Sequence, residues 1–392
     1  MTSARRSPSE AAMWLDKPRN PDAPLAGLKV LELARILAGP FAGQTLADLG
    51  ADVIKVEAPE GDGTRQWGPP FVERSDGARE AAYYHGCNRG KRGITADFRD
   101  ADDLARVTDL AGEADVVLEN FLPGKLAKFG LDYPSLSAAN SALVYCSISG
   151  FGQDGPRRDE PGYDFVIQAM SGFMALTGEP EGAPMKHGMS ISDLFCGLYS
   201  TIAIQAALAM RARTGKGQHI DMALYDCSVA LLAHQAQSFF TTGENPPRMG
   251  NMHAQVSAYG VFPTRDGPVV LAPANDRLFR KLLEVFERHD LLGDERFATN
   301  EARIANRAEI DGIIAAETAQ WDRDALLRQC REAGVPAGPI YEVSEVFEEP
   351  QVKARGMTFP MADGLTGLRS PFRFSDAELA LGEASPKLGQ DD

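Results

Sequence analysis

The first half of the chain alternates short apolar runs with segments of helical periodicity. Residues 28–33 and 52–56 are apolar runs of strand length, and residues 38–49 between them have the pattern of a helix that stops at Gly50. A strand, a helix and a second strand joined by short links predict a parallel βαβ unit.

The same pattern recurs farther along the chain. Residues 89–98 contain a turn and a strand, residues 103–111 are helical, and residues 114–118 and 142–148 are further strands. Repeated units of this kind are typical of an α/β fold with a doubly wound parallel sheet. The sequence predicts such a domain over roughly the first 150 residues.

The second half has longer helices and one hairpin. We predict a long helix over 194–213, a strand over 219–222, a helix over 223–240, a hairpin over 259–272 that turns at Asp266 and Gly267, and helices over 276–289, 299–316 and 322–333. The resulting division is a flexible N-terminal extension (1–23), a large Rossmann-like domain (24–213), a linker strand and helix (214–240), a smaller α+β domain (241–342) and a return to the large domain (343–392).

Composition and charge narrow the class of protein. Hydrophobic residues make up 44% of the chain, which is enough for a folded core, and the net charge of −15 argues against a general nucleic-acid or anionic-membrane binder. The N-terminal segment lacks the apolar core of a secretory signal, and the longest apolar stretch, 194–210, is interrupted by Gln205. We therefore expect no nucleic-acid and no membrane partner.

The five cysteines are scattered. They stand at positions 87, 146, 196, 227 and 330, with no CxxC pair and no Cys/His cluster at metal-ligand spacing. This distribution favours reduced thiols, no metal and a cytoplasmic location.

Residues 150–155 match the glycine pattern GxGxxG after a strand. A dinucleotide-binding fingerprint also needs a helix to begin there, whereas Pro156 and Pro161 follow. The segment is better interpreted as a ligand-lining loop at the end of a strand.

Two basic clusters lie at the ends of predicted α/β elements. One contains Arg89, Lys91 and Arg92, and the other follows the strand at 114–118 and contains Lys125 and Lys128. They are either solvated surface residues or the site for the phosphates of a nucleotide-like ligand.

Asp193 stands at the predicted start of the long helix. Aspartate is a favourable N-cap, so a structural role is the simplest interpretation. A carboxylate kept ionised by the helix dipole and by backbone donors is also a competent nucleophile toward an acyl carbon. Serine-hydrolase chemistry has little support, because the chain has no GxSxG motif.

Nine segments together resemble the family III CoA-transferases. They are residues 27–40 (GLKVLELARILAGP), 46–57 (LADLGADVIKVE), 88–97 (NRGKRGITAD), 119–125 (ENFLPGK), 147–156 (SISGFGQDGP), 162–178, 214–226, 248–253 and 334–339. The resemblance covers about residues 24–390 and implies a Rossmann-like large domain, a smaller domain and an interlocked homodimer.

The resemblance also implies an activity. Family members move coenzyme A (CoA) from an acyl-CoA to a small carboxylic acid, and the family's catalytic aspartate corresponds to Asp193. The expected intermediates are an aspartyl–acyl anhydride and an aspartyl-CoA thioester. Tyr163 stands where the racemase branch of the superfamily has a histidine base, so racemisation is disfavoured. A CoA-dependent racemase or isomerase and a non-catalytic CoA-binding protein remain the alternatives.

Within the family the chain most resembles the succinate–hydroxymethylglutarate-type transferases, which use dicarboxylic acids, and residues 63–70 support that affiliation. This resemblance implies succinyl-CoA or another dicarboxyl-CoA as the donor. The residues expected to bind CoA are Leu37, Ala38, Arg92, Asn120, Phe121, Lys125, Lys128, Ser149, Gly150 and Phe151. The candidate cations for the distal carboxylate of the substrate are Arg35, Arg65 and Lys186, and the candidate lid is Met249, Gly250 and Asn251.

Overall fold

The computed structural model describes residues 14–392 and divides the chain into two compact units. Unit 1 runs to Met174 and takes in Lys186–Thr242 and Lys353–Asp392, and unit 2 consists of Ala175–Met185 and Gly243–Val352. The segment 214–240, predicted as a linker, lies within unit 1. The second unit also includes the excursion at Ala175–Met185, which no hydrophobic pattern had indicated.

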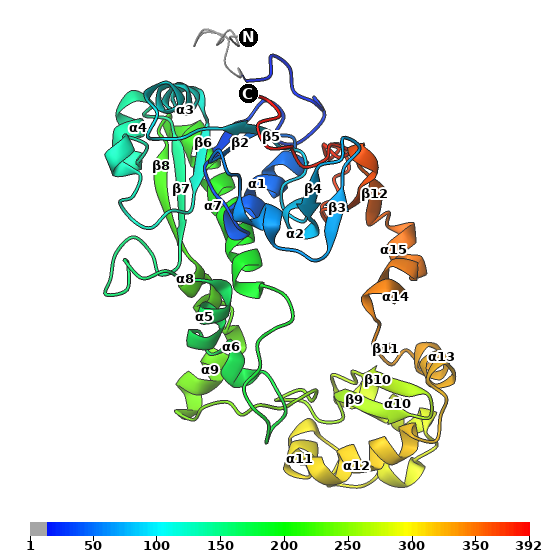
Figure 1. Ribbon diagram of the computed structural model, residues 1–392. Helices are drawn as coiled ribbons and strands as arrows, with labels where there is room; N and C mark the ends of the chain where they lie inside the picture. The colour runs from blue at the N-terminus through cyan, green and yellow to red at the C-terminus, as the bar shows by residue number, and fades with distance from the viewer. Residues whose placement is uncertain (1–13) are drawn as a thin grey trace. The chain divides into compact units, whose positions relative to one another are not determined.

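Unit 1 is built on a six-stranded, wholly parallel sheet in the order β5-β2-β1-β6-β7-β8 (Figure 1). The strands are β1 (Lys29–Glu32), β2 (Asp52–Glu57), β5 (Arg92–Thr95), β6 (Val116–Glu119), β7 (Val144–Ser149) and β8 (Gln218–Ala223). Numbered along the chain, this order is 3-2-1-4-5-6, which is the Rossmann order. The predicted doubly wound sheet is therefore confirmed.

Helices cover both faces of this sheet. Helices α1 (Ala38–Asp48) and α7 (Ile191–Thr214) enclose one apolar core, and α3 (Ala101–Glu113) and α4 (Tyr133–Ala139) enclose another on the opposite face. Neighbouring residues of β1 serve the two cores in turn, because successive side chains of a strand point to opposite faces: Val30 belongs to the first and Leu31 to the second.

The contact between α1 and α7 is unusually close at one position. A Cβ atom built on Gly197 of α7 would lie 2.7 Å from the carbonyl oxygen of Ala38 at the start of α1. By length and composition alone, α7 could also cross a membrane, but a core helix meets the same criterion. In unit 1 it packs against α1, α5 (Asp164–Met170) and α8 (Leu224–Ala230).

The predicted helix over 223–240 is in fact two helices, α8 and α9 (Ala233–Thr242). The chain breaks at Ala233, whose φ of 43° lies in the left-handed region. Unit 1 also contains the hairpin of β3 (Phe71–Glu73) and β4 (Arg79–Ala81), the short helix α2 (Ala82–His85), and the hairpin of β12 (Thr358–Pro360) and β13 (Thr366–Leu368). Helices α6 (Phe173–Leu176) and α15 (Pro350–Ala354) are divided between the two units.

Unit 2 contains an antiparallel sheet in the order β11-β10-β9. The predicted hairpin is confirmed as β9 (Gly260–Thr264) and β10 (Gly267–Leu271), and β11 (Ala337–Pro339) joins it. The helices are α10 (Asp276–Val285), α11 (Asn300–Ala305), α12 (Arg307–Thr318), α13 (Arg323–Ala333) and α14 (Val343–Glu348).

Residues 14–23 are not a flexible extension. Trp14 and Ala23 are buried, Trp14 belongs to the core on the α3 side, and the Leu15 amide donates to Asp52 at 2.9 Å. The prediction of a flexible extension is wrong for residues 14–23, because the Trp14 indole packs into the core although the segment around it is polar. Residues 1–13 of the predicted extension lie outside the described residues.

Replacing Gly197 by alanine tests the α1–α7 contact. The added methyl group would press on the Ala38 carbonyl, so Gly197→Ala should destabilise the protein by about 1–3 kcal/mol, measured by urea denaturation. The matched control is Gly112→Ala in α3, where a Cβ atom meets nothing within 4 Å. That exchange should stabilise the helix by about 0.5–1 kcal/mol. Equal effects at the two positions would contradict the interpretation.

Candidate active site

The sheet order reverses between β1 and β6, and a cavity of about 200 Å³ lies beyond the carboxyl ends of these strands. Open parallel sheets bind their ligands at this switch point. The cavity is lined by Arg35, Ile36, Leu37, Ala38, Asn120, Phe121, Leu122, Ile148, Ser149, Gly150, Pro161, Gly162, Tyr163, Asp193 and Leu224. All these residues belong to unit 1.

Asp193 is the third residue of α7, and Ser190 is the N-cap. The carboxylate is half-buried and faces the cavity. The prediction that Asp193 is the N-cap is therefore wrong, because Asp193 lies within the first turn of the helix. Asp164 instead serves the start of α7, accepting a hydrogen bond from the Ser192 amide at 2.9 Å.

The environment of Asp193 does not hold it in the ionised form. Burial, followed by the nearby charge of Asp164, raises the pKa of Asp193 to about 7. Within residues 14–392, no backbone amide donates to this carboxylate. The expectation that backbone donors keep it ionised is wrong. A weakly solvated carboxylate that titrates near neutrality is, however, a stronger nucleophile than an exposed one.

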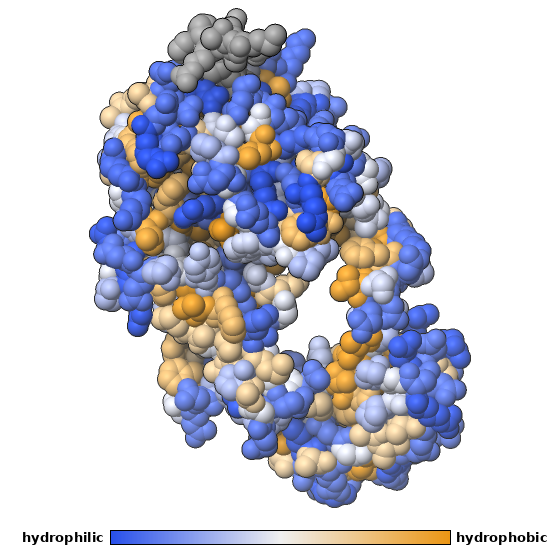
Figure 2. Space-filling view, in the orientation of Figure 1, coloured by the Kyte–Doolittle hydropathy of each residue, from blue (hydrophilic) through white to orange (hydrophobic). Residues whose placement is uncertain are grey.

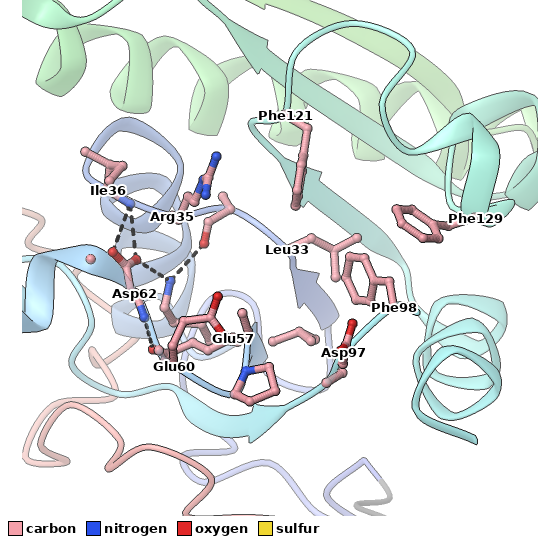
Figure 3. Close-up of a pocket in the computed structure, with 18 of the residues that line it drawn as sticks. Leu33, Arg35, Ile36, Glu57, Glu60, Asp62, Asp97, Phe98, Phe121 and Phe129 are labelled. Atoms are coloured by element: carbon pink, nitrogen blue, oxygen red, sulfur yellow. Dashed lines mark hydrogen bonds and ion pairs between the residues drawn. The ribbon is translucent and has the colours of Figure 1, made fainter. Parts of the chain in front are cut away.

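A larger cavity of about 380 Å³ shares Arg35, Ile36, Phe121 and Tyr163 with the first (Figure 3). One wall carries the aromatic side chains Phe98, Phe121 and Phe129, and another carries Glu57, Glu60, Asp62 and Asp97. Phe98 and Phe129 contact each other edge to face, with ring centroids 5.6 Å apart. The two cavities are therefore neighbours, and Asp193 lines the smaller one whereas Phe98 and Phe129 line the larger one.

Asn120 joins the two strand ends that bound the site. Its Oδ1 accepts a hydrogen bond from the Arg35 amide at 2.9 Å, and its Nδ2 donates to the Arg35 carbonyl at 2.6 Å. Next to it, the Phe121 amide donates to the buried Glu119 carboxyl at 2.7 Å. Burial raises the pKa of Glu119 to about 7, against the lowering effect of its hydrogen bonds with Ser147 and Phe121.

The structure brings eight of the seventeen predicted site residues together at the smaller cavity. Lining the smaller cavity with Asp193 are Arg35, Leu37, Ala38, Asn120, Phe121, Ser149 and Gly150. Phe151 instead packs against Tyr225, with ring centroids 5.8 Å apart. Lys125 and Lys128 are exposed after β6, and the Lys128 ammonium lies 4.6 Å from the ring centroid of Phe129.

Three predicted cations lie elsewhere. Arg92 begins β5 at the amino end of the sheet and pairs with Asp52 at 3.3 Å. Arg65 is buried in an ion-pair network with Glu57 and Glu80, so it does not face a substrate. Lys186 is exposed and donates to the His187 carbonyl at 3.2 Å.

The candidate lid, Met249, Gly250 and Asn251, lies in unit 2. The Gly250 amide donates to the Gly178 carbonyl at 3.0 Å, and the Arg248 guanidinium donates to the Gly182 carbonyl at 2.8 Å. The loop is thus tied to the excursion at Ala175–Met185.

Two residues near Asp193 were not singled out from the sequence. The Tyr83 hydroxyl is close enough to Asp193 and Asp164 that both carboxylates help to raise the pKa of Tyr83, after burial as the main cause. Tyr83 lies in none of the segments that carry the family resemblance, whereas Asp164 lies in residues 162–178, where only Tyr163 was given a role.

The family model described as CoA-transferase family III matches residues 25–392. The chain belongs to this family. It is 52% identical to a succinate–glutarate CoA-transferase of Agrobacterium fabrum, over 95% of this chain and 94% of that protein, and 37% identical to the human succinyl-CoA:glutarate CoA-transferase, over 96% and 87%.

Solved structures agree with this assignment. A CaiB/BaiF family protein from Brucella suis superimposes with a TM-score of 0.86 at 57% identity, covering 94% of this chain and 97% of that one. The Mycobacterium tuberculosis protein Rv3272 gives a TM-score of 0.84 at 30% identity, covering 95% and 98%. This family III CoA-transferase is therefore an enzyme that acts on CoA thioesters.

The raised pKa of Asp193 predicts that the protein becomes less stable as pH rises. The folded protein holds this proton up to about pH 7, whereas the unfolded chain releases it near pH 4, so ionisation destabilises the fold as pH rises between these values. Asp193→Asn removes the titration. Its melting temperature should therefore exceed that of the wild type by more at pH 8 than at pH 5.

The exposed Asp109 of α3 supplies the control for that measurement. Asp109→Asn makes the same chemical change, and its shift in melting temperature should be similar at the two pH values. If Asp193→Asn and the wild type also differed in melting temperature by the same amount at pH 5 and pH 8, Asp193 would not be held in a desolvated site.

Proposed function

We propose that the enzyme transfers CoA from succinyl-CoA to a dicarboxylic acid of about the size of glutarate. The observation that carries this proposal is Asp193, which lines a cavity that shares four lining residues with a larger, partly aromatic one. Relatives with similarity over most of their length are named for succinate, glutarate and, in Haloarcula hispanica, mesaconate.

The proposed chemistry has four acyl transfers. The Asp193 carboxylate attacks the donor thioester carbon, the C–S bond breaks, and a mixed anhydride and CoA thiolate form. The thiolate attacks the aspartyl carbon and releases the first acid as its carboxylate, which leaves an aspartyl-CoA thioester. The acceptor carboxylate attacks that thioester and again gives an anhydride and thiolate. The thiolate then takes the new acyl group and regenerates Asp193.

The cavities suggest how CoA lies. We place the nucleotide of CoA against Phe98, Phe121 and Phe129, and the thioester next to Leu37 and Ala38. Helix α1 begins there, and its N-cap Leu37 provides no side-chain cap. The free amides and positive end of the helix dipole favour a thiolate or an oxyanion in the smaller cavity. Because both intermediates react with water, the half-buried position of Asp193 also protects them.

Arg35 is the cation that we assign to the distal carboxylate of the substrate. It lines both cavities, and no ion pair joins it to a carboxylate within the described part of the chain. A guanidinium without an acidic partner in a protein of net charge −15 is suited to bind an anion.

We also propose that the enzyme works as a homodimer in the cytoplasm. Several large apolar side chains are exposed, among them Ile202 of α7, Phe240 of α9 and Val343 of α14, at 62%, 74% and 73%. Figure 2 shows apolar surface around the α14 segment, where Val346 and Phe347 are also exposed. Patches of this kind favour association with a second chain.

The nucleophile is tested with Asp193→Asn. The amide cannot form the anhydride, so transfer from succinyl-CoA to glutarate should fall by about a thousandfold or more. Hydroxylamine added during turnover should leave a hydroxamate at Asp193 in the wild type, detected by mass spectrometry of the peptide. Transfer without this modification would overturn the mechanism. Solvent deuterium at the α-carbon would instead indicate a racemase, and CoA binding without transfer an inactive binding protein.

Arg35→Gln tests the assignment of the distal carboxylate. Since Arg35 would pair only with the second carboxylate, the variant should lose about 10–100-fold in kcat/KM for glutarate and much less for valerate, a monocarboxylate of the same chain length. The concentration of succinyl-CoA can be varied in the same assay. Equal losses with both acceptors would place Arg35 against CoA and contradict the assignment.

A further inference from the structure

Ile36 has a backbone conformation that a β-branched residue rarely adopts. It lies in the loop between β1 and α1, and its φ is +72°. A side chain branched at Cβ is strained in this region, so the surrounding structure must hold the turn in place. Ile36 lines both cavities and directly precedes Leu37 and Ala38.

Asp62 is the group that holds this turn. Its carboxylate accepts a hydrogen bond from the Ile36 amide, at 3.1 Å to Oδ2 and 3.4 Å to Oδ1 (Figure 3). Asp62 is itself fixed by the Thr64 amide and hydroxyl, at 3.0 and 2.8 Å, and by an ion pair of 3.2 Å with Lys55. The side chains of Asp62 and Lys55 are both fully buried.

Lys55 extends the same support to the preceding residue. Its ammonium donates to the Ala34 carbonyl at 2.8 Å and pairs with Glu32 at 3.2 Å. Lys91, on the other side of Glu32, donates to the Pro40 carbonyl at 2.8 Å. The four side chains Glu32, Lys55, Asp62 and Lys91 form a neutral buried cluster, and three of them bind backbone groups of the loop that precedes and begins α1.

We propose that Asp62 is a positioning residue for CoA transfer: by holding Ile36 in the left-handed turn, it fixes Leu37 and Ala38 against the cavity that contains Asp193. Asp62 lines the larger cavity and Ile36 lines both, so this hydrogen bond links the two ends of the site. The inference rests on the proposed function, since its readout is CoA transfer.

A purely structural role for Asp62 is the competing interpretation. Asp62 is also the N-cap of the 3₁₀ turn Gly63–Gln66, and it belongs to a buried charge cluster whose loss would destabilise any protein. The two roles differ in one respect. If Asp62 acts through the strained turn, its importance depends on the residue at position 36, because glycine adopts positive φ without strain.

The test compares Asp62→Asn in the wild-type and Ile36→Gly backgrounds. In the wild type we expect kcat to fall by about 10–100-fold, because a displacement of about 1 Å at a reaction centre has an effect of this size. In the Ile36→Gly background we expect a change of less than about threefold, because that turn no longer needs to be held. Both KM values and the melting temperature are measured with kcat.

The matched control is Asp48→Asn. Asp48 is another buried aspartate at the far end of α1, and in the described part of the chain its carboxylate is bonded to Arg89 and Ser370 and not to the loop before α1. This exchange should lower the melting temperature with less than about a threefold change in kcat. A similar loss of kcat in Asp48→Asn and Asp62→Asn would mean that general destabilisation is sufficient, and would overturn the inference.

Each remaining outcome also decides the question. A large loss from Asp62→Asn in both backgrounds, or a small loss in both, overturns the inference. If Asp62→Asn does not fold in the wild-type background, the double variant decides by itself, because retained activity relative to Ile36→Gly supports the role and lost activity overturns it. A wild-type enzyme without transfer activity would refute the proposed function instead.

Discussion

Four charged side chains with almost no access to water support the loop that carries the active site. Glu32 at the end of β1, Lys55 on β2, Asp62 after β2 and Lys91 before β5 come from segments that only the parallel sheet brings together. Buried charges are costly unless each is paired, and here each is. Burial alone would lower the pKa of Lys55, yet the neighbouring Glu32 and Asp62 raise it above its usual value. The ion pairs with Lys55 and Lys91 hold Glu32 and Asp62 in place.

Burial and neighbouring charges shift the pKa values of Asp62 and Asp193 in opposite directions. Burial raises the pKa of both, but Lys55 and Thr64 more than offset this for Asp62, whose pKa is lowered. Among residues 14–392 no cation offsets the burial of Asp193, and Asp164 is nearby, so its pKa is raised to about 7. A carboxylate that supports structure is thus kept charged, whereas the one that faces the cavity is poorly solvated. The difference comes from the neighbours and not from the helix terminus.

Much of the fold could be predicted from the sequence, because apolar runs and helical periodicity report local structure. The βαβ units, the hairpin at Asp266 and the long helix through Cys196 were all found in this way. Leu37 and Asn120 were expected in the site from the family resemblance, and the fold explains their position because each follows the carboxyl end of a parallel strand. Arg65 was misjudged because its partners, Glu57 and Glu80, meet it only in three dimensions. The break at Ala233 and the docking of Trp14 likewise depend on contacts that periodicity does not encode.

The two cavities have four lining residues in common, Arg35, Ile36, Phe121 and Tyr163. If CoA lies as we propose, any exchange among these side chains alters the surroundings of both parts of a bound thioester at once. Acceptor preference can therefore diverge most freely through residues that line the smaller cavity alone, such as Leu122, Pro161 and Leu224. Among related enzymes we expect substitutions to accumulate at those positions, whereas the four shared residues should change slowly. Acceptor preference would then evolve at a few positions while the residues that bind CoA stay the same.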